Sequence, residues 1–344
     1  MIGRSALVLG SLLVGFLLLE LGVRLWRGAL LDWPNLVALD RRNSVAQGVG
    51  RLIHHPELGY VARPGFARDG VSYDGRGFRS HPPLASAAAP VLVVGDSYAH
   101  GDEVADNETW AAQLQAILGR PVLNAALTGY GLDQSVLRAE RIAAEVKPAA
   151  IVLGFIADDL RRAEMSRVWG RPKPYFELVR GEPLLRNVPV PPPPDPDGTL
   201  DLWQRLFGWS VALDTVLRHQ GWQYEWAVDH ARVLPRGAGA ALACPLLKRL
   251  AKLRVPVLVV AEYDPWGWQD AAFLRDQRAA TATVLNCAEA AGFAGLDLFD
   301  TMDAAMQAFG RRELYRVNHP SPLGTRLAAD RIAAALKAHI PVVR

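Results

Sequence analysis

The chain has 344 residues, a formal net charge of +3 and a 50% share of hydrophobic side chains. This length accommodates one large domain with insertions or two smaller ones, and the apolar share excludes a wholly disordered chain. Two cysteines exclude a disulfide-rich scaffold and a four-cysteine zinc site. The weak charge, with no basic run interleaved with aromatics, argues against nucleic-acid binding.

The N-terminus predicts a membrane anchor. Residues 5–19, SALVLGSLLVGFLLL, carry no charge. A helix over residues 5–26 would rise about 33 Å, enough to cross the apolar core of a bilayer. Glu20 and Arg24 are four residues apart, so they can pair on one face of this helix. No cleavage site follows, which predicts an uncleaved signal anchor over residues 1–27 in contact with membrane lipid; the other interpretation is a buried core helix.

Residues 28–84 are polar and rich in turn residues, and we expect a neck of short strands here. Beyond Pro90 the pattern alternates between short apolar strands and amphipathic helices. The predicted strands are 91–95, 121–127, 149–156, 255–264 and 295–300, and the predicted helices are 109–118, 132–146, 244–253, 270–291 and 323–340. Uniformly apolar strands that alternate with helices indicate a doubly wound parallel sheet covered on both faces, so residues 85–344 are predicted to form one α/β domain.

An insertion over about residues 160–240 interrupts the alternation. It contains a proline run over residues 188–197, which favours extended backbone, and a tryptophan-rich stretch follows. Residues 201–219 have the apolar spacing of a helix. Two interpretations stay open at this point. The segment is either a helical hairpin packed on the core or a lid, substrate groove or partner surface.

Two residues are candidates for nucleophilic catalysis. Ser97 follows the first apolar strand in the sequence GDSY, where a glycine before the serine permits a tight strand-to-helix turn. Such a turn exposes the hydroxyl and places the serine N–H at a helix start, where it can stabilise an oxyanion. His319 precedes the last helix, on a loop that returns to the carboxyl edge of the sheet. From there it can reach Ser97 as a general base.

Four short segments resemble the sequence blocks of the SGNH (GDSL-type) hydrolase family, in order and in spacing. They are GDSY (95–98), NAALTGYG (124–131), GFIADD (154–159) and HPSPLG (319–324). The resemblance covers about residues 85–338. The upstream segments HHPELGY, RPG and GRGFRS and the anchor also resemble membrane-anchored members found in bacterial envelopes. It implies a flavodoxin-like sheet of five parallel strands and no cofactor or metal.

The resemblance also assigns roles to individual residues. Ser97 would be the nucleophile and His319 the base, with the N–H groups of Ser97 and Gly129 as oxyanion donors. The chain would be a single-pass protein of the bacterial inner membrane with a periplasmic soluble domain.

The sequence departs from the family pattern at two positions. Asp158 stands where the third block supplies an oxyanion-binding Asn, and an ionised carboxylate cannot donate a hydrogen bond. The family also places an Asp two or three residues before the histidine, where this chain has Val317 and Arg316. We therefore expect a Ser–His dyad, unless another carboxylate reaches the imidazole from elsewhere. The carboxylates considered are Asp264, Asp300 and Asp303.

Two classes of function follow. The first is an anchored serine esterase or O-acyltransferase that acts on acyl esters, acetyl esters above all, of envelope carbohydrates, the substrate class implied by the anchored relatives. The second is a catalytically impaired scaffold or accessory subunit of a membrane protein complex. Cys244 and Cys287, on helices flanking the fourth strand, either pair or remain two buried thiols.

Overall fold

The computed structural model describes residues 2–31, 33–39, 50–193, 200–220, 222, 226 and 237–341. The chain divides into two compact units. The larger unit consists of Gly50–Ser166, Lys173–Pro192 and Arg236–Arg344, and the smaller one of Met1–Val49, Arg167–Pro172 and Pro193–Pro235.

A five-stranded parallel sheet forms the centre of the larger unit, with the strand order β13-β12-β7-β5-β6. The strands are β5 (Val91–Val94), β6 (Val122–Asn124), β7 (Ala150–Phe155), β12 (Val257–Ala261) and β13 (Ala294–Asp297). Every residue of β5, β7 and β12 is buried, which explains their uniformly apolar sequences. The predicted doubly wound sheet is confirmed. Its order reverses beside β5, and ligands bind at the carboxyl edge of such a switch point.

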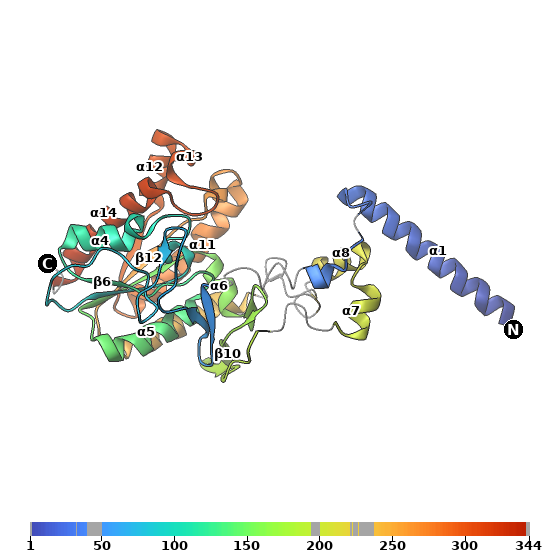
Figure 1. The fold of residues 1–344 in the computed structure, drawn as a ribbon, viewed down its shortest axis with the longest axis horizontal. Helices are drawn as coiled ribbons and strands as arrows, with labels where there is room; N and C mark the ends of the chain where they lie inside the picture. Colours follow the sequence, from blue (N-terminus) through green and yellow to red (C-terminus); the bar gives the residue numbers. More distant parts are fainter. Residues whose placement is uncertain are drawn as a thin grey trace. The chain divides into compact units, whose positions relative to one another are not determined.

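Helices cover both faces of this sheet (Figure 1). One face carries α5 (Leu132–Val146), α10 (Ala238–Ala251) and α11 (Ala271–Ala290). The other carries α4 (Trp110–Leu118), α12 (Phe299–Phe309) and α14 (Pro322–His339). Shorter helices lie at the carboxyl edge: α3 (Ser97–His100), η1 (Asp106–Glu108), α6 (Asp158–Ala163), η3 (Pro265–Trp268) and α13 (Arg311–Leu314).

Most predicted elements lie within a few residues of their observed bounds. The largest difference is at α10, which begins at Ala238 where a helix from residue 244 was expected. The strand β13 ends at Asp297 where a strand to residue 300 was expected. The side chain of Asp297 accepts a hydrogen bond from the Phe299 N–H at 2.9 Å, at the start of α12, a helix that the sequence analysis did not predict.

The polar neck forms short antiparallel pairs, as expected for its turn-rich sequence. They are β1 (Leu52–His55) with β2 (Gly59–Ala62), and β3 (Ala67–Arg68) with β4 (Val71–Ser72). The first pair is joined to the loop after β6 by two tyrosines. Tyr60 donates to the Thr128 carbonyl at 3.0 Å, and Tyr130 donates to the Tyr60 carbonyl at 2.6 Å.

In its described residues, the insertion adds two hairpins and two helices, where the sequence predicted a single helix. The hairpins are β8 (Arg167–Val168) with β9 (Arg171–Pro172) and β10 (Tyr175–Val179) with β11 (Glu182–Arg186). The helices are α7 (Leu202–Phe207) and α8 (Val211–His219). The break between α7 and α8 ends at Ser210, whose side chain caps α8 by accepting from the Leu213 N–H at 3.0 Å. Residues 188–193 form no helix or strand, and the rest of the predicted extended run lies outside the described residues.

The helical part of the insertion belongs to the smaller unit together with α1 (Ile2–Arg27). Both interpretations of this segment, a hairpin packed on the core or a lid, substrate groove or partner surface, stay predictions. Within the smaller unit, the Glu20 carboxylate of α1 accepts from the Ala212 N–H of α8 at 3.0 Å. Within α1, the segment Arg4–Arg27 contains an 18-residue window with a mean hydropathy of 2.3, and it is long and apolar enough to cross a membrane.

A disulfide joins two helices on one face of the sheet. It links Cys244 of α10 to Cys287 of α11, across a sequence separation of 43 residues. This resolves the alternative that the sequence left open between a disulfide and two free thiols.

Candidate active site

The turn after β5 positions Ser97 at the carboxyl edge of the sheet. Gly95 has φ +151°, and a Cβ there would lie 2.5 Å from the Gly154 carbonyl oxygen, so a side chain does not fit. Asp96 caps α3 by accepting from the Tyr98 N–H at 3.0 Å. Ser97 therefore begins a helix, where the first N–H groups have no intrahelical acceptor.

The structure brings Ser97 and His319 together. The distance between Ser97 Oγ and His319 Nε2 is 2.8 Å, which is hydrogen-bond contact. His319 lies on the loop between α13 and α14. Tyr98 supports that loop, since its hydroxyl donates to the Asn318 carbonyl at 2.7 Å and its ring lies 5.0 Å from the imidazole between centroids. This is the arrangement required of a nucleophile and its base.

Glu103 completes a chain of three side chains. Its Oε1 lies 3.0 Å from His319 Nδ1, and its Oε2 accepts from the Val317 N–H at 2.8 Å. Burial acts to raise the pKa of Glu103, but the contacts with His319 and the backbone N–H groups outweigh it and lower the pKa below its ordinary value. An ionised Glu103 fixes the proton of His319 on Nδ1, which leaves Nε2 free to accept from Ser97.

Glu103 was not predicted from the sequence, which indicated a Ser–His dyad. Of the three aspartates considered, Asp264 caps η3 at the Trp266 N–H, and Asp303 accepts from Trp268 Nε1 at 2.8 Å. Asp300 is exposed on α12. Glu103 reaches the imidazole because α3 ends after one turn and the chain reverses there; Glu103 itself has φ +68°. The available signal was an acidic pair, Asp102 and Glu103, a few residues after the first block in GDSYAHGDE.

A second histidine holds the loop that carries Glu103. His100 is fully buried, with its Nδ1 2.6 Å from Asp102 Oδ1 and its Nε2 3.0 Å from the Tyr73 hydroxyl. Burial lowers the pKa of His100 to about 4, so the ring is neutral at physiological pH. Asp102 also accepts from the Thr128 hydroxyl at 2.8 Å. This bond links the Glu103 loop to the loop that contains Gly129.

The two predicted oxyanion donors come from neighbouring loops at this edge. The Ser97 N–H lies in the first turn of α3. Gly129 has φ +77°, a conformation that favours glycine, in the turn between β6 and α5. Backbone N–H groups held in this way are suitable donors to a developing oxyanion.

Asp158, at the position of the family's Asn, begins α6 and is bound by two arginines. Its Oδ1 accepts from Arg161 Nε at 2.5 Å, and its Oδ2 lies 2.8 Å from Arg162 Nε. Arg162 also contacts Asp159 at 2.9 Å and lies 3.6 Å from Asp96. Asp158 is thus held as a charge-paired acceptor, and its side chain supplies no N–H to an oxyanion.

A tryptophan borders the site beside His319. Trp266 of η3 is 48% exposed, and its Nε1 donates to Asn318 Oδ1 at 3.1 Å. The guanidinium of Arg311 lies 4.9 Å from the centre of its ring. An exposed indole fixed next to His319 offers a flat apolar surface near the reacting groups.

No group of three or more His, Cys, Asp or Glu side chains is placed to hold a metal ion within the described part of the chain.

Comparison with known proteins matches residues 93–327 to the sequence model of the GDSL-like Lipase/Acylhydrolase family. The match contains all four blocks, including His319. Among curated proteins no match was found.

Similar solved structures include TesA, at 15% identity and a TM-score of 0.41, which covers 74% of this chain and 99% of its own. LAE5, an α/β hydrolase enzyme from the metagenome of Lake Arreo, Spain, has 14% identity and a TM-score of 0.46 and covers 74% of this chain and 98% of its own. A catalytic mutant of Axe2, an acetylxylan esterase from Geobacillus stearothermophilus, has 13% identity and a TM-score of 0.45 over 76% of this chain and 99% of its own.

Proposed function

Since the chain belongs to the GDSL-like lipase/acylhydrolase family, we propose that it is a serine esterase that works through an acyl-enzyme on Ser97. The observation that carries the proposal is the continuous contact from Ser97 Oγ to His319 Nε2, and from His319 Nδ1 to Glu103. A serine hydroxyl is a weak nucleophile until an adjacent base takes its proton, and the base works best when a third group orients it.

The reaction follows from these contacts. Ser97 Oγ attacks the ester carbonyl while His319 Nε2 takes the hydroxyl proton, and the imidazolium is stabilised by Glu103. The N–H groups of Ser97 and Gly129 bind the tetrahedral oxyanion. The intermediate collapses as His319 returns the proton to the leaving alcohol. Water, or a sugar hydroxyl in a transferase, then attacks the acyl-Ser97 with His319 as base, which releases the acyl product and restores Ser97.

Asp158 limits the rate of this reaction. A single side-chain donor to an oxyanion contributes about 3 kcal/mol, which is roughly a hundredfold in rate or more. With Asp158 held by Arg161 and Arg162, the proposed oxyanion site has backbone donors only. This is also the observation that favours the alternative function, a scaffold or accessory subunit in which catalysis is impaired.

For the substrate we propose an acetyl ester of a carbohydrate. Trp266 supports this class, because pyranose rings present C–H groups that pack well on an exposed aromatic face. Its bond to Asn318, the neighbour of His319, places that face beside the catalytic base. A sugar stacked on Trp266 would be positioned by the same loop that holds His319.

We place the catalytic unit outside the cytoplasm, anchored by α1 to the inner membrane. The apolar composition of α1 supports the anchor. The disulfide between Cys244 and Cys287 supports a periplasmic location for the unit that contains it, because such bonds persist in oxidising compartments.

The proposal is tested with the full chain purified in detergent. Hydrolysis of a short-chain aryl acetate and of an acetylated pyranoside is measured for the wild type and Ser97→Ala, with Ser86→Ala as a matched control on an exposed loop. We expect turnover that is lost in Ser97→Ala and retained in Ser86→Ala. Equal turnover in wild type and Ser97→Ala would refute the nucleophile. An inactive wild type that no fluorophosphonate labels would favour the scaffold.

A further inference from the structure

The last turns of α1 contain a buried ion pair in a helix whose other side chains are mostly exposed. Glu20 and Arg24 are only 1% and 0% exposed and pair at 2.6 Å, whereas Leu12 of the same helix is 65% exposed. Charged side chains within a membrane-spanning segment cost free energy unless they are paired. The burial of this pair therefore indicates that α1 packs against another part of the chain here.

The contact partner of Glu20 is the N-terminus of α8. The Glu20 carboxylate accepts from the Ser210 hydroxyl at 2.7 Å and from the N–H groups of Val211 and Ala212 at 2.9 and 3.0 Å. These are N–H groups that a helix start leaves without an intrahelical acceptor. Glu20 thus caps α8 from a different helix and joins the insertion to α1.

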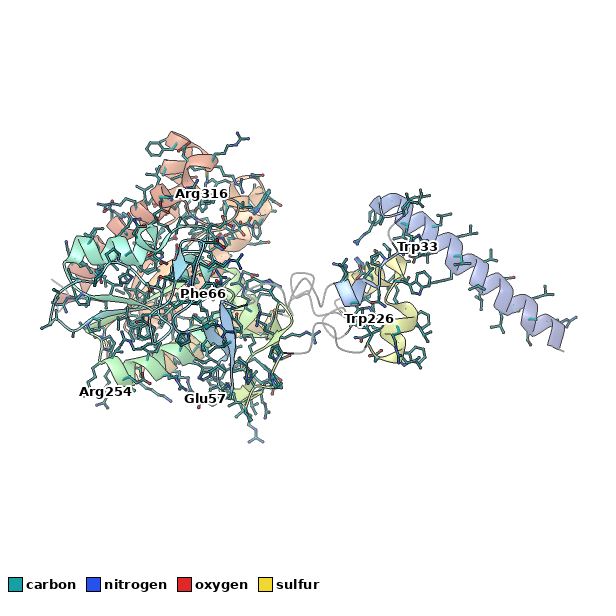
Figure 2. The ribbon with its side chains drawn as sticks, in the orientation of Figure 1. Trp33, Glu57, Phe66, Trp226, Arg254 and Arg316 are labelled. Carbon is teal, nitrogen blue, oxygen red and sulfur yellow. A yellow bond between two sulfur atoms is a disulfide. The ribbon has the colours of Figure 1, made fainter. Side chains whose placement is uncertain are left out.

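Arg24 and three aromatic rings extend this junction. Arg24 donates to the Trp209 carbonyl at 2.6 Å, and its guanidinium lies 3.8 Å from the centre of the Trp33 ring. Trp33 lies at the C-terminal end of α1 (Figure 2). The Trp209 ring lies 5.8 Å from that of Trp33 and 6.2 Å from that of Phe16. At about 1.5 Å per residue, Phe16 lies about 16 Å along the helix from its end at Arg27, so the junction falls within the second half of α1.

Directly before this junction, α7 presents an apolar face to the outside. The four large apolar residues of this helix are all exposed, and their spacing places them on one side. They are Leu202 (57%), Trp203 (62%), Leu206 (50%) and Phe207 (37%). The rings of Trp203 and Phe207 stack at 5.9 Å.

The other side of α7 is fastened to the chain that follows α1. Asn35 Nδ2 donates to the Gln204 carbonyl at 2.8 Å, and the Leu36 N–H donates to the Gly208 carbonyl at 2.6 Å. These bonds hold α7 at the C-terminal end of α1 with its apolar side chains turned away. Trp26 and Leu31, 76% and 90% exposed, add apolar surface at the same end.

We propose that α7 lies in the headgroup region of the membrane leaflet in which α1 ends, with its apolar face inserted at the acyl boundary. Lipid is the occupant that the geometry favours, because α7 is tied through α8 to residues of α1 that would themselves lie in the bilayer. A short helix with Trp, Leu and Phe on one face is typical of an interfacial segment. The insertion is then a second attachment that fixes how the anchor meets the membrane. This inference rests only on the membrane anchoring in the proposed function.

The test uses nitroxide labels on the full chain reconstituted in vesicles of phosphatidylcholine and phosphatidylglycerol. The variants are Leu206→Cys on the apolar face of α7, Arg205→Cys on its opposite side, Leu12→Cys in α1, and Arg275→Cys as a surface control on α11. Labelling without reductant leaves the Cys244–Cys287 disulfide intact. Collision rates with oxygen, which concentrates in lipid, and with an aqueous nickel chelate report the depth of each label.

We expect the ratio of oxygen to chelate collisions at residue 206 to exceed that at residue 275 by several-fold, and residue 205 to resemble residue 275. Equal ratios at residues 206 and 275 would overturn the proposal. So would spin–spin broadening at residue 206 that disappears on dilution with unlabelled protein, since a second copy would then cover the face. This inference alone fails if the label at residue 206 is in water while the label at residue 12 is shielded from the aqueous chelate and the esterase is active. If residue 12 is also in water, the anchoring fails with it.

Discussion

Replacing Glu103 with glutamine removes the negative charge beside His319 Nδ1 and keeps the length of the side chain. The carboxylate holds the imidazole at 3.0 Å and stabilises the imidazolium that forms when Ser97 loses its proton. A glutamine oxygen can still accept from Nδ1, but it carries no charge to balance the imidazolium. The expected defect is therefore in the chemical step, with a lower kcat and little change in KM.

The magnitude follows from the kind of contact and its exposure. A hydrogen bond to a charged group contributes about 1.5–3 kcal/mol, which corresponds to about a 10- to 150-fold loss of kcat. The loss reaches about 10⁴-fold in the buried triad of a serine protease. The Glu103 side chain is 28% exposed, so water screens it and the smaller range applies.

The assay compares kcat for an aryl acetate in wild type, Glu103→Gln and Asp69→Asn. Asp69 is a suitable control because it is also an acidic residue in the left-handed region, with φ +52° and a side chain that is 81% exposed. Thermal unfolding of Glu103→Gln should stay close to that of the wild type. If Glu103→Gln keeps wild-type kcat while His319→Ala is inactive, the reasoning about Glu103 is wrong.

Three further predictions concern binding and stability. Trp266→Ala should raise KM for an acetylated pyranoside several-fold and leave KM for an aryl acetate unchanged. Trp266→Phe, which keeps an aromatic ring, should retain most of the binding of the pyranoside. Equal effects of Trp266→Ala on both substrates would contradict a stacking role. Replacing both Cys244 and Cys287 with serine should lower the free energy of unfolding by about 4 kcal/mol, the chain-entropy value for the 43-residue separation, measured in urea. A loss below about 1 kcal/mol would contradict it. Burial lowers the pKa of His100 to about 4 in the folded protein. As the pH decreases, His100 therefore binds a proton near pH 6.5 in the unfolded chain but only near pH 4 in the folded state. The free energy of unfolding should therefore fall by up to about 3 kcal/mol as the pH decreases across this window. In His100→Gln, urea unfolding at a series of pH values should show no such dependence of stability on pH. An unchanged dependence would assign it to other groups.

The sheet and the Ser97–His319 pair could be predicted because their determinants are local. Uniformly apolar strands predict a parallel sheet, and a glycine before Ser97 predicts a turn at the carboxyl edge of that sheet. A parallel sheet brings its loops to one edge whatever their separation in sequence. For this reason Ser97 and His319 meet across 222 positions of the chain.

Glu103 could not be predicted in the same way. Its role depends on α3 ending after four residues and on the left-handed conformation of Glu103 itself, and neither follows from apolar periodicity. The position of the insertion depends on Glu20 meeting Ser210 across 190 positions, a contact with no periodic signal. The pairing of Asp158 with Arg161 and Arg162 is different, because spacings of three and four on a helix indicate such pairs directly.

Covalent labelling of Ser97 tests the central claim most directly. The full chain is incubated with a fluorophosphonate, and the modified residue is located by peptide mass spectrometry. A working site predicts one adduct, on Ser97, that forms more slowly in Glu103→Gln and in His319→Ala and is absent in Ser97→Ala. Ester hydrolysis that continues while Ser97 carries no adduct, or an adduct on another residue that abolishes activity, would contradict the account.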